Sequence, residues 1–183
     1  LNFVSALLFF PNFLSYFNPM AGSRDKAHWY FADTNLDWGQ DLFAAVRFVR
    51  QREPDRPLYV AHWGSVPPRL AGMPEYEIPP VDARQIPPEI VLSDSAVGPQ
   101  PGLYVVSICL VKGCPGTVVD FNNKPQYSLA NTYSYLQYFE HFEPIATVGS
   151  SLWCYDITPD QAYRVRSKLK NIRAQNANNV VQL

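Results

Sequence analysis

Oxygen-bearing side chains crowd the segment from Tyr30 to Leu42, which reads YFADTNLDWGQDL. Asp33, Asn35 and Asp37 alternate as D-x-N-x-D, the first half of a calcium-binding loop. The second half does not follow, because the glycine comes one place late and Ala44 stands where a bidentate glutamate is needed. The segment therefore predicts no metal site.

A helix terminus explains most of these side chains. Asp37 is predicted to cap a helix beginning at Trp38, with its carboxylate accepting from the backbone N–H of Gly39 or Gln40. Asp41 would lie in the positive first turn of that helix. The first carboxylate of the segment and Gln40 should project near the carboxyl end of the preceding strand, where ligands of parallel sheets bind. The candidate binding or structural motif is Asp33, Asn35, Asp37, Trp38, Gln40 and Asp41.

Acid and base catalysis has little support in the sequence. No histidine lies in the carboxylate segment, and His28, His62 and His141 are far apart. His62 ends a predicted strand and is the histidine to watch, although a hydrogen-bonded core histidine is the favoured interpretation. The chain has no nucleophile elbow, phosphate-binding loop, dinucleotide fingerprint or zinc-protease motif. No residue is therefore assigned as catalytic, and no cofactor is predicted.

Cysteine spacing allows one disulfide. Cys109 and Cys114 flank a turn-forming glycine and could be bridged in an oxidising compartment. The alternative is two small buried apolar side chains. Neither C-x-x-C nor a nearby histidine pair is present, so zinc is not predicted.

Charge is unevenly distributed along the 183 residues, whose formal net charge is -1. This balance gives no positive field for nucleic acid, so no nucleic-acid partner is predicted. Residues 1–23 carry no charge at all, and their first ten residues are strongly apolar. Ten residues fall short of the ~20 that cross a bilayer, which leaves the tail of a spanning helix, an interfacial helix or a core helix. We expect interfacial membrane contact through Phe9, Phe10, Phe13 and Phe17.

The order of predicted elements is α/β: a three-layer sheet with flanking helices, preceded by the apolar membrane-associated segment. Strands are expected around Tyr30, Leu58, Tyr104 and Thr147, parallel or mixed, with residues 145–157 forming one last strand. Helices are expected over residues 38–51, 131–142 and 159–172, the last one capped by Thr158.

A proline-rich stretch lies within the predicted domain. Residues 67–101 contain nine of the seventeen prolines, so they should form an extended arm, with one helical turn near 69–73, that lies on the domain or on a neighbour. The predicted organisation is a membrane-proximal segment 1–23, an α/β domain 24–175 and a tail 176–183.

Two blocks carry a family resemblance over most of the chain. The more specific block, TNLDWGQDL, spans Thr34 to Leu42, and the looser block, EPIATVGSSLWCY, spans Glu143 to Tyr155. Together with FLSYFNPMAG, HWG and GLYVVSICLV, they resemble the carboxyl-terminal region of bacterial phospholipid-carrier-dependent glycosyltransferases, a membrane family similar to dolichyl-phosphate-mannose protein mannosyltransferases.

This resemblance implies a periplasmic or extracytoplasmic α/β domain that follows the last membrane helix. The sugar-transfer carboxylates of that family lie in an amino-terminal loop that this chain does not contain. The resemblance therefore implies a non-catalytic accessory or structural module whose partners are a membrane and membrane protein subunits. The alternative is a carboxyl-terminal fragment of an active enzyme, and a polyprenyl-linked sugar would be a partner only of such a full-length enzyme.

Overall fold

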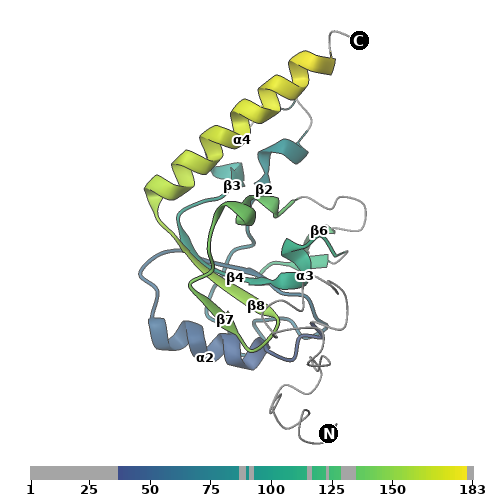
Figure 1. Ribbon diagram of the computed structural model, residues 1–183. Helices are drawn as coiled ribbons and strands as arrows, with labels where there is room; N and C mark the ends of the chain where they lie inside the picture. Colours follow the sequence, from purple (N-terminus) through teal and green to yellow (C-terminus); the bar gives the residue numbers. More distant parts are fainter. Residues whose placement is uncertain are drawn as a thin grey trace, which may run out of the picture.

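A computed structural model describes residues 37–86, 90, 93–114, 117–122, 124–128 and 135–180. Over these residues it has a mixed α/β architecture with one four-stranded sheet and three α-helices (Figure 1). The predicted α/β class is confirmed. Several predictions lie outside the described residues: the apolar segment with its four phenylalanines, the strand at Tyr30, and the positions of Asp33 and Asn35.

The main sheet has the strand order β1-β4-β8-β7. Strands β1 (Leu58–Ala61) and β4 (Gly102–Ser107) are parallel, and β8 (Leu152–Ile157) runs antiparallel to β4. The prediction of one last strand over residues 145–157 is wrong, because β7 (Ala146–Val148) and β8 form a hairpin. The chain reverses at Gly149, whose φ of 62° favours glycine.

Alternation along the strands builds a core on each face of this sheet. Leu103 and Val105 of β4 belong to the cluster that packs against α2 (Leu42–Arg52), while Tyr104 and Val106 belong to the cluster on the opposite face. Figure 1 shows α2 on the opposite side of the sheet from α4 (Pro159–Val180). The apolar face predicted for the first helix is buried, but the helix begins at Leu42 and not at Trp38.

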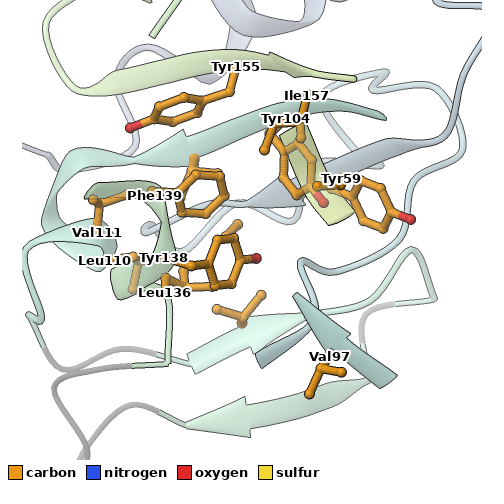
Figure 2. Close-up of a cluster of buried hydrophobic side chains, with 14 of the residues drawn as sticks. Tyr59, Val97, Tyr104, Leu110, Val111, Leu136, Tyr138, Phe139, Tyr155 and Ile157 are labelled. Atoms are coloured by element: carbon orange, nitrogen blue, oxygen red, sulfur yellow. The ribbon is translucent and has the colours of Figure 1, made fainter. Parts of the chain in front are cut away.

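The second core is aromatic (Figure 2). Phe139 stacks on Tyr155 at 4.7 Å between ring centroids and meets Tyr104 edge-on at 5.3 Å. The predicted helix 131–142 is wrong where the structure describes it, because only a short 3₁₀ helix, η6 (Gln137–His141), is found there. The short helix lets Tyr138 and Phe139, which are neighbours in sequence, both enter the core.

The proline-rich arm lies on the domain, as predicted, in its described part. The expected helical turn is present, with the N–H of Gly72 donating to the carbonyl of Arg69 (3.0 Å). Glu77 then exchanges backbone hydrogen bonds with β1, and the two-residue strands β2 (Val81–Asp82) and β3 (Val97–Gly98) pair in parallel. The arm also contains the 3₁₀ helices η4 (Ala83–Gln85) and η5 (Asp94–Ala96).

Helix α4 is hydrogen-bonded to the proline-rich arm through two arginines. Its start is capped as predicted, since the N–H of Gln161 donates to the Thr158 hydroxyl (3.3 Å) and the Gln161 side chain accepts from the Thr158 N–H (2.9 Å). Arg166 donates to the carbonyl of Pro99 (2.6 Å), and Arg173 donates to the carbonyl of Ile86 (3.1 Å). The helix continues to Val180, so residues 176–180 are not the irregular tail that was predicted.

Two small elements complete the described structure. Helix α3 (Ile108–Val111) follows β4 directly, and strands β5 (Thr117–Val119) and β6 (Pro125–Ser128) form an antiparallel pair. None of the helices within the described ranges is long and apolar enough to cross a membrane.

Candidate functional site

Four segments meet at one edge of the main sheet. His62 follows β1 and Ser107 ends β4, so both lie at the carboxyl ends of parallel strands. The turn between β7 and β8 reaches the same edge, because Ser107 pairs with Leu152 and the carbonyl of Ser151 accepts from the N–H of Ile108 (2.8 Å). The loop before α2 brings the carboxylate segment onto this edge. Carboxyl ends of strands are where α/β proteins usually place their sites.

Asp41 is held by the hairpin turn. Its Oδ2 accepts from the backbone N–H groups of Ser150 (2.6 Å) and Ser151 (3.0 Å). The same oxygen accepts from the hydroxyls of Ser150 (3.1 Å) and Ser151 (2.9 Å). Successive N–H groups in a turn form a concave binding site for an anion, and here the anion is a side chain of the same chain. Asp41 is only 3% exposed, so this arrangement is closed to solvent.

Only glycine at position 149 leaves room for the buried Asp41 carboxylate. An ideal Cβ on Gly149 would lie 2.0 Å from Cγ of Asp41, and the positive φ disfavours any other residue as well. Asp41 was predicted to act on the helix dipole, but its side chain makes no capping hydrogen bond to α2. Asp41 is the N-cap residue of α2 and not a member of its first turn, and its carboxylate accepts hydrogen bonds from a turn 109 residues away in sequence.

Asp37 is bound by fewer donors. Its Oδ1 accepts from the N–H of Gly39 (2.7 Å), which is the hydrogen bond predicted for it, and its Oδ2 accepts from the Ser107 hydroxyl. The side chain is fully buried, and burial raises its pKa from 3.8 to about 6, although hydrogen bonds from Ser107, Gly39 and Ser151 oppose this shift. Asp37 closes an Asx turn before α2 and links that turn to the end of β4. It is not the helix cap that was predicted, because α2 begins at Leu42 with Asp41 at its N-cap.

His62 is buried beside the same loop. It is 7% exposed, and neither ring nitrogen has a hydrogen-bond partner in the part of the chain that the structure describes. The prediction of a hydrogen-bonded core histidine is thus only half correct. Two glycines press on the ring: a Cβ on Gly64 would lie 2.6 Å from Nε2, and a Cβ on Gly39 would lie 3.0 Å from Cε1. Burial lowers the pKa of His62 to about 4, so the ring is neutral at pH 7.

The other predicted residues do not join this polar cluster of Asp37, Asp41, Ser107, Ser150 and Ser151. The Gln40 side chain turns back and accepts from the N–H of Trp38 (2.7 Å), and the Trp38 side chain is 63% exposed. Cys109 and Cys114 lie in a separate buried cluster and are present as thiols, so their disulfide stays a prediction. Across the described ranges, no group of three or more histidine, cysteine or acidic side chains could hold a metal ion.

Sequence reasoning missed the three serines and Gly149. The available signal was the G-S-S triplet between two apolar runs, which is typical of a turn and rich in hydrogen-bond donors. Ser107 gave no signal, because it stands inside an apolar strand pattern.

An open cleft of about 490 Å³ borders the other side of the hairpin turn. Its lining combines aromatic and charged side chains with Gly149 and Ser150; the charged and aromatic members include Lys112, Glu140, Phe142, Glu143 and Trp153. The ammonium of Lys112 lies 5.4 Å from the centroid of the Trp153 ring. This cleft, and not the buried cluster, has the openness that a diffusing ligand needs.

Comparisons of the chain with family models, with curated proteins and with solved structures found no match. The class of protein is therefore defined by its own architecture. It is a mixed α/β protein with a closed polar cluster at one sheet edge and an open cleft beside it.

Proposed function

We propose that this chain is a non-catalytic, extracytoplasmic α/β module, with three layers and an apolar membrane-associated amino terminus, that acts on a membrane protein complex. In this proposal it is related to phospholipid-carrier-dependent glycosyltransferases. The two blocks that carry the resemblance support the idea of a shared structural role, because they meet in space: Asp41 of the first block accepts hydrogen bonds from Ser150 and Ser151 of the second.

The burial of the carboxylates supports the non-catalytic part of the proposal. Asp37 is 0% and Asp41 3% exposed, and the oxygens of both accept hydrogen bonds from neighbouring backbone and hydroxyl groups. A general acid or base must come within hydrogen-bond reach of the substrate. These two groups reach only the protein itself, so they hold the loop, the sheet and the hairpin together.

The experiment uses the tagged full chain, expressed in bacteria and recovered from membranes in mild detergent. We expect membrane protein subunits to copurify in fixed stoichiometry. Sugar transfer from a polyprenyl-phosphate sugar is then measured in that assembly with wild-type chain and with Asp37→Asn, which preserves size and one acceptor oxygen. Equal transfer rates are expected. A folded Asp37→Asn chain that assembles normally but abolishes transfer would overturn the non-catalytic role, and a monomer that purifies without detergent would overturn the membrane assembly.

The open cleft favours a second candidate, in which the chain is the ligand-binding, carboxyl-terminal part of an active glycosyltransferase. A pyranose has apolar C–H faces that pack on aromatic rings and hydroxyls that hydrogen-bond to carboxylates and ammonium groups. Trp153, Glu143 and Lys112 offer these three partners in one cleft. Titration of monosaccharides against the indole N–H signals in a nitrogen-15 NMR spectrum tests it. Shifts that disappear in Glu143→Gln but persist in the exposed Glu53→Gln would favour this candidate.

A further inference from the structure

The outer surface of the α2 layer combines arginine with exposed apolar side chains. Helix α2 and the segment 62–74 together cover one face of the sheet, since both contribute to the same buried cluster through residues such as Val46 and Met73. The segment approaches the loop before α2, where a Cβ on Gly64 would lie 2.9 Å from Cα of Gly39. It contacts the helix itself where Arg50 donates to the carbonyl of Gly72 (2.8 Å). The segment therefore runs beside the helix, and their exposed side chains share one surface.

This surface exposes large apolar groups. Trp38 is 63%, Phe43 61% and Leu70 67% exposed, and Val66 is also exposed between them in sequence. Single exposed apolar residues are ordinary on protein surfaces, but several on adjoining segments mark an interaction site.

The charge within these two segments is positive, and exposed glutamates, Glu53 and Glu75, stand only at their carboxyl ends. Residues 42–52 and 62–74 contain four arginines and no aspartate, glutamate or lysine. On α2, Phe43, Arg47 and Arg50 are all exposed and follow a spacing that places them on one side of the helix. Arg69 is exposed on the neighbouring segment. Arginine pairs with phosphate through its fork of donors, and tryptophan favours the boundary between lipid tails and head groups.

We propose that this arginine-aromatic surface, made by Trp38, Phe43, Arg47, Val66, Arg69 and Leu70, docks the domain onto an anionic lipid surface. This inference rests on the proposed membrane placement and names the partner that the surface contacts. Two observations select lipid as the occupant. The positive charge of the exposed Arg47 and Arg69 complements phosphate head groups. The chain also contains residues 1–23, which carry no charge and many apolar side chains, a composition that suits contact with lipid.

The test measures partitioning of the full chain into vesicles of phosphatidylcholine and into vesicles of phosphatidylcholine mixed equally with phosphatidylglycerol. Because residues 1–23 are uncharged, their contribution should be the same for both lipids, and the ratio of the two partition coefficients reports on the arginines. Arg47→Gln combined with Arg69→Gln should lower that ratio by roughly 5-fold per arginine at low salt. The matched control is Arg164→Gln with Lys168→Gln, which removes the same charge from exposed positions on α4, across the sheet.

Apolar contact is tested by a second matched pair. Leu70 and Tyr163 are both 67% exposed, but Tyr163 lies on α4. Leu70→Ser should weaken binding to both kinds of vesicle, and Tyr163→Ser should leave it unchanged. Equal effects of the two arms of either pair, or equal affinity of the wild type for neutral and anionic vesicles, would overturn the proposal. These outcomes are independent of sugar transfer and copurification, so they separate this surface from the non-catalytic role.

Discussion

Asp37 and Asp41 are four residues apart and equally buried, yet their surroundings differ. One oxygen of Asp41 accepts four hydrogen bonds, all from the hairpin turn at Ser150 and Ser151. Asp37 accepts from the local N–H of Gly39, from the Ser107 hydroxyl and from the Ser151 side chain, and its pKa is raised to about 6 by burial.

The difference shows that burial alone does not define the role of a carboxylate. A buried charge is costly unless donors replace the lost water. The turn at Gly149 supplies such donors to Asp41, whereas Asp37 retains part of the desolvation cost. Both carboxylates therefore join distant parts of the chain, but only Asp37 has a pKa that burial raises, which makes its contribution to stability sensitive to pH.

The largest expected loss of stability comes from a side chain that fills the space beside the Asp41 carboxylate. Gly149→Ala would place Cβ 2.0 Å from the Asp41 carboxylate carbon, at a φ of 62°, and should lower the free energy of unfolding by about 4 kcal/mol. The control is Gly72→Ala, which has a similar φ of 88° but meets only the flexible end of Arg50, and should cost about 1 kcal/mol. Urea unfolding measures both. Equal losses in the two variants would mean that backbone strain, and not the carboxylate, makes glycine necessary.

Removing the charges one at a time sharpens the comparison. Asp41→Asn weakens four hydrogen bonds to a buried anion and should destabilise the protein by about 2 to 3 kcal/mol at pH 7. Asp37→Asn removes a charge that burial disfavours and should stabilise it by about 1 to 3 kcal/mol. Thermal and urea unfolding of the two variants side by side check the signs. A loss of stability in both would contradict the distinction between the two carboxylates.

The pH dependence of the unfolding free energy should contain two opposing contributions, one from Asp37 and one from His62. The pKa of Asp37 is raised from 3.8 to about 6, so the folded state binds more protons in this window and the stability from this group falls as pH rises through it. The pKa of His62 is lowered from 6.5 to about 4, so the unfolded state binds more protons there and the stability from His62 is lost as pH falls from 6.5 to 4. The two contributions oppose each other between about pH 4 and 6.

Single variants should expose each contribution. Relative to the wild type, Asp37→Asn should make the unfolding free energy rise more steeply with pH across this window, because the contribution of His62 is no longer opposed by Asp37. His62→Gln should change the slope in the opposite direction, because the contribution of Asp37 is no longer opposed by His62. Each total change should be about 3 kcal/mol, as two pKa units imply. A flat profile in both variants would show that neither group titrates differently in the folded chain.

The smallest expected effect serves as a reference remote from both carboxylates. Thr158→Ala removes one half of the capping box at the start of α4 and should cost about 1 kcal/mol. Circular dichroism at increasing temperature measures it. A loss as large as that of Asp41→Asn would mean that the cap of α4, and not the hairpin turn, dominates the stability of the described fold.

Local patterns predicted the elements that rely on local interactions. The apolar face of α2, the cap at Thr158 and the positions of β1 and β4 followed from periodicity and capping chemistry. The hairpin of β7 and β8 was missed because its apolar residues form a nearly continuous run on both sides of Gly149. The helix expected over residues 131–142 was also wrong, because aromatic packing of Tyr138 and Phe139 took precedence over helix propensity in the part that is described.

The candidate site could be predicted only in half. The sequence identified Asp37 and its hydrogen bond to Gly39, which is local. It could not identify the partners of Asp41, because Ser150 and Ser151 are 109 and 110 residues away and no local rule constrains such a separation. His62 was recognised as buried, but the two glycines that cover it come from different segments.

The arginines of α4 set an order for folding during synthesis. Arg166 and Arg173 donate hydrogen bonds to the carbonyls of Pro99, Ile90 and Ile86, which lie 67 to 87 positions earlier in the sequence. The ribosome synthesises the proline-rich arm before α4, so the arm cannot form its hydrogen bonds to these arginines until α4 has emerged. Contacts of such long sequence separation form slowly, and these can form only after α4 has been synthesised. A stalled chain ending before α4 would therefore present the arm to chaperones and proteases.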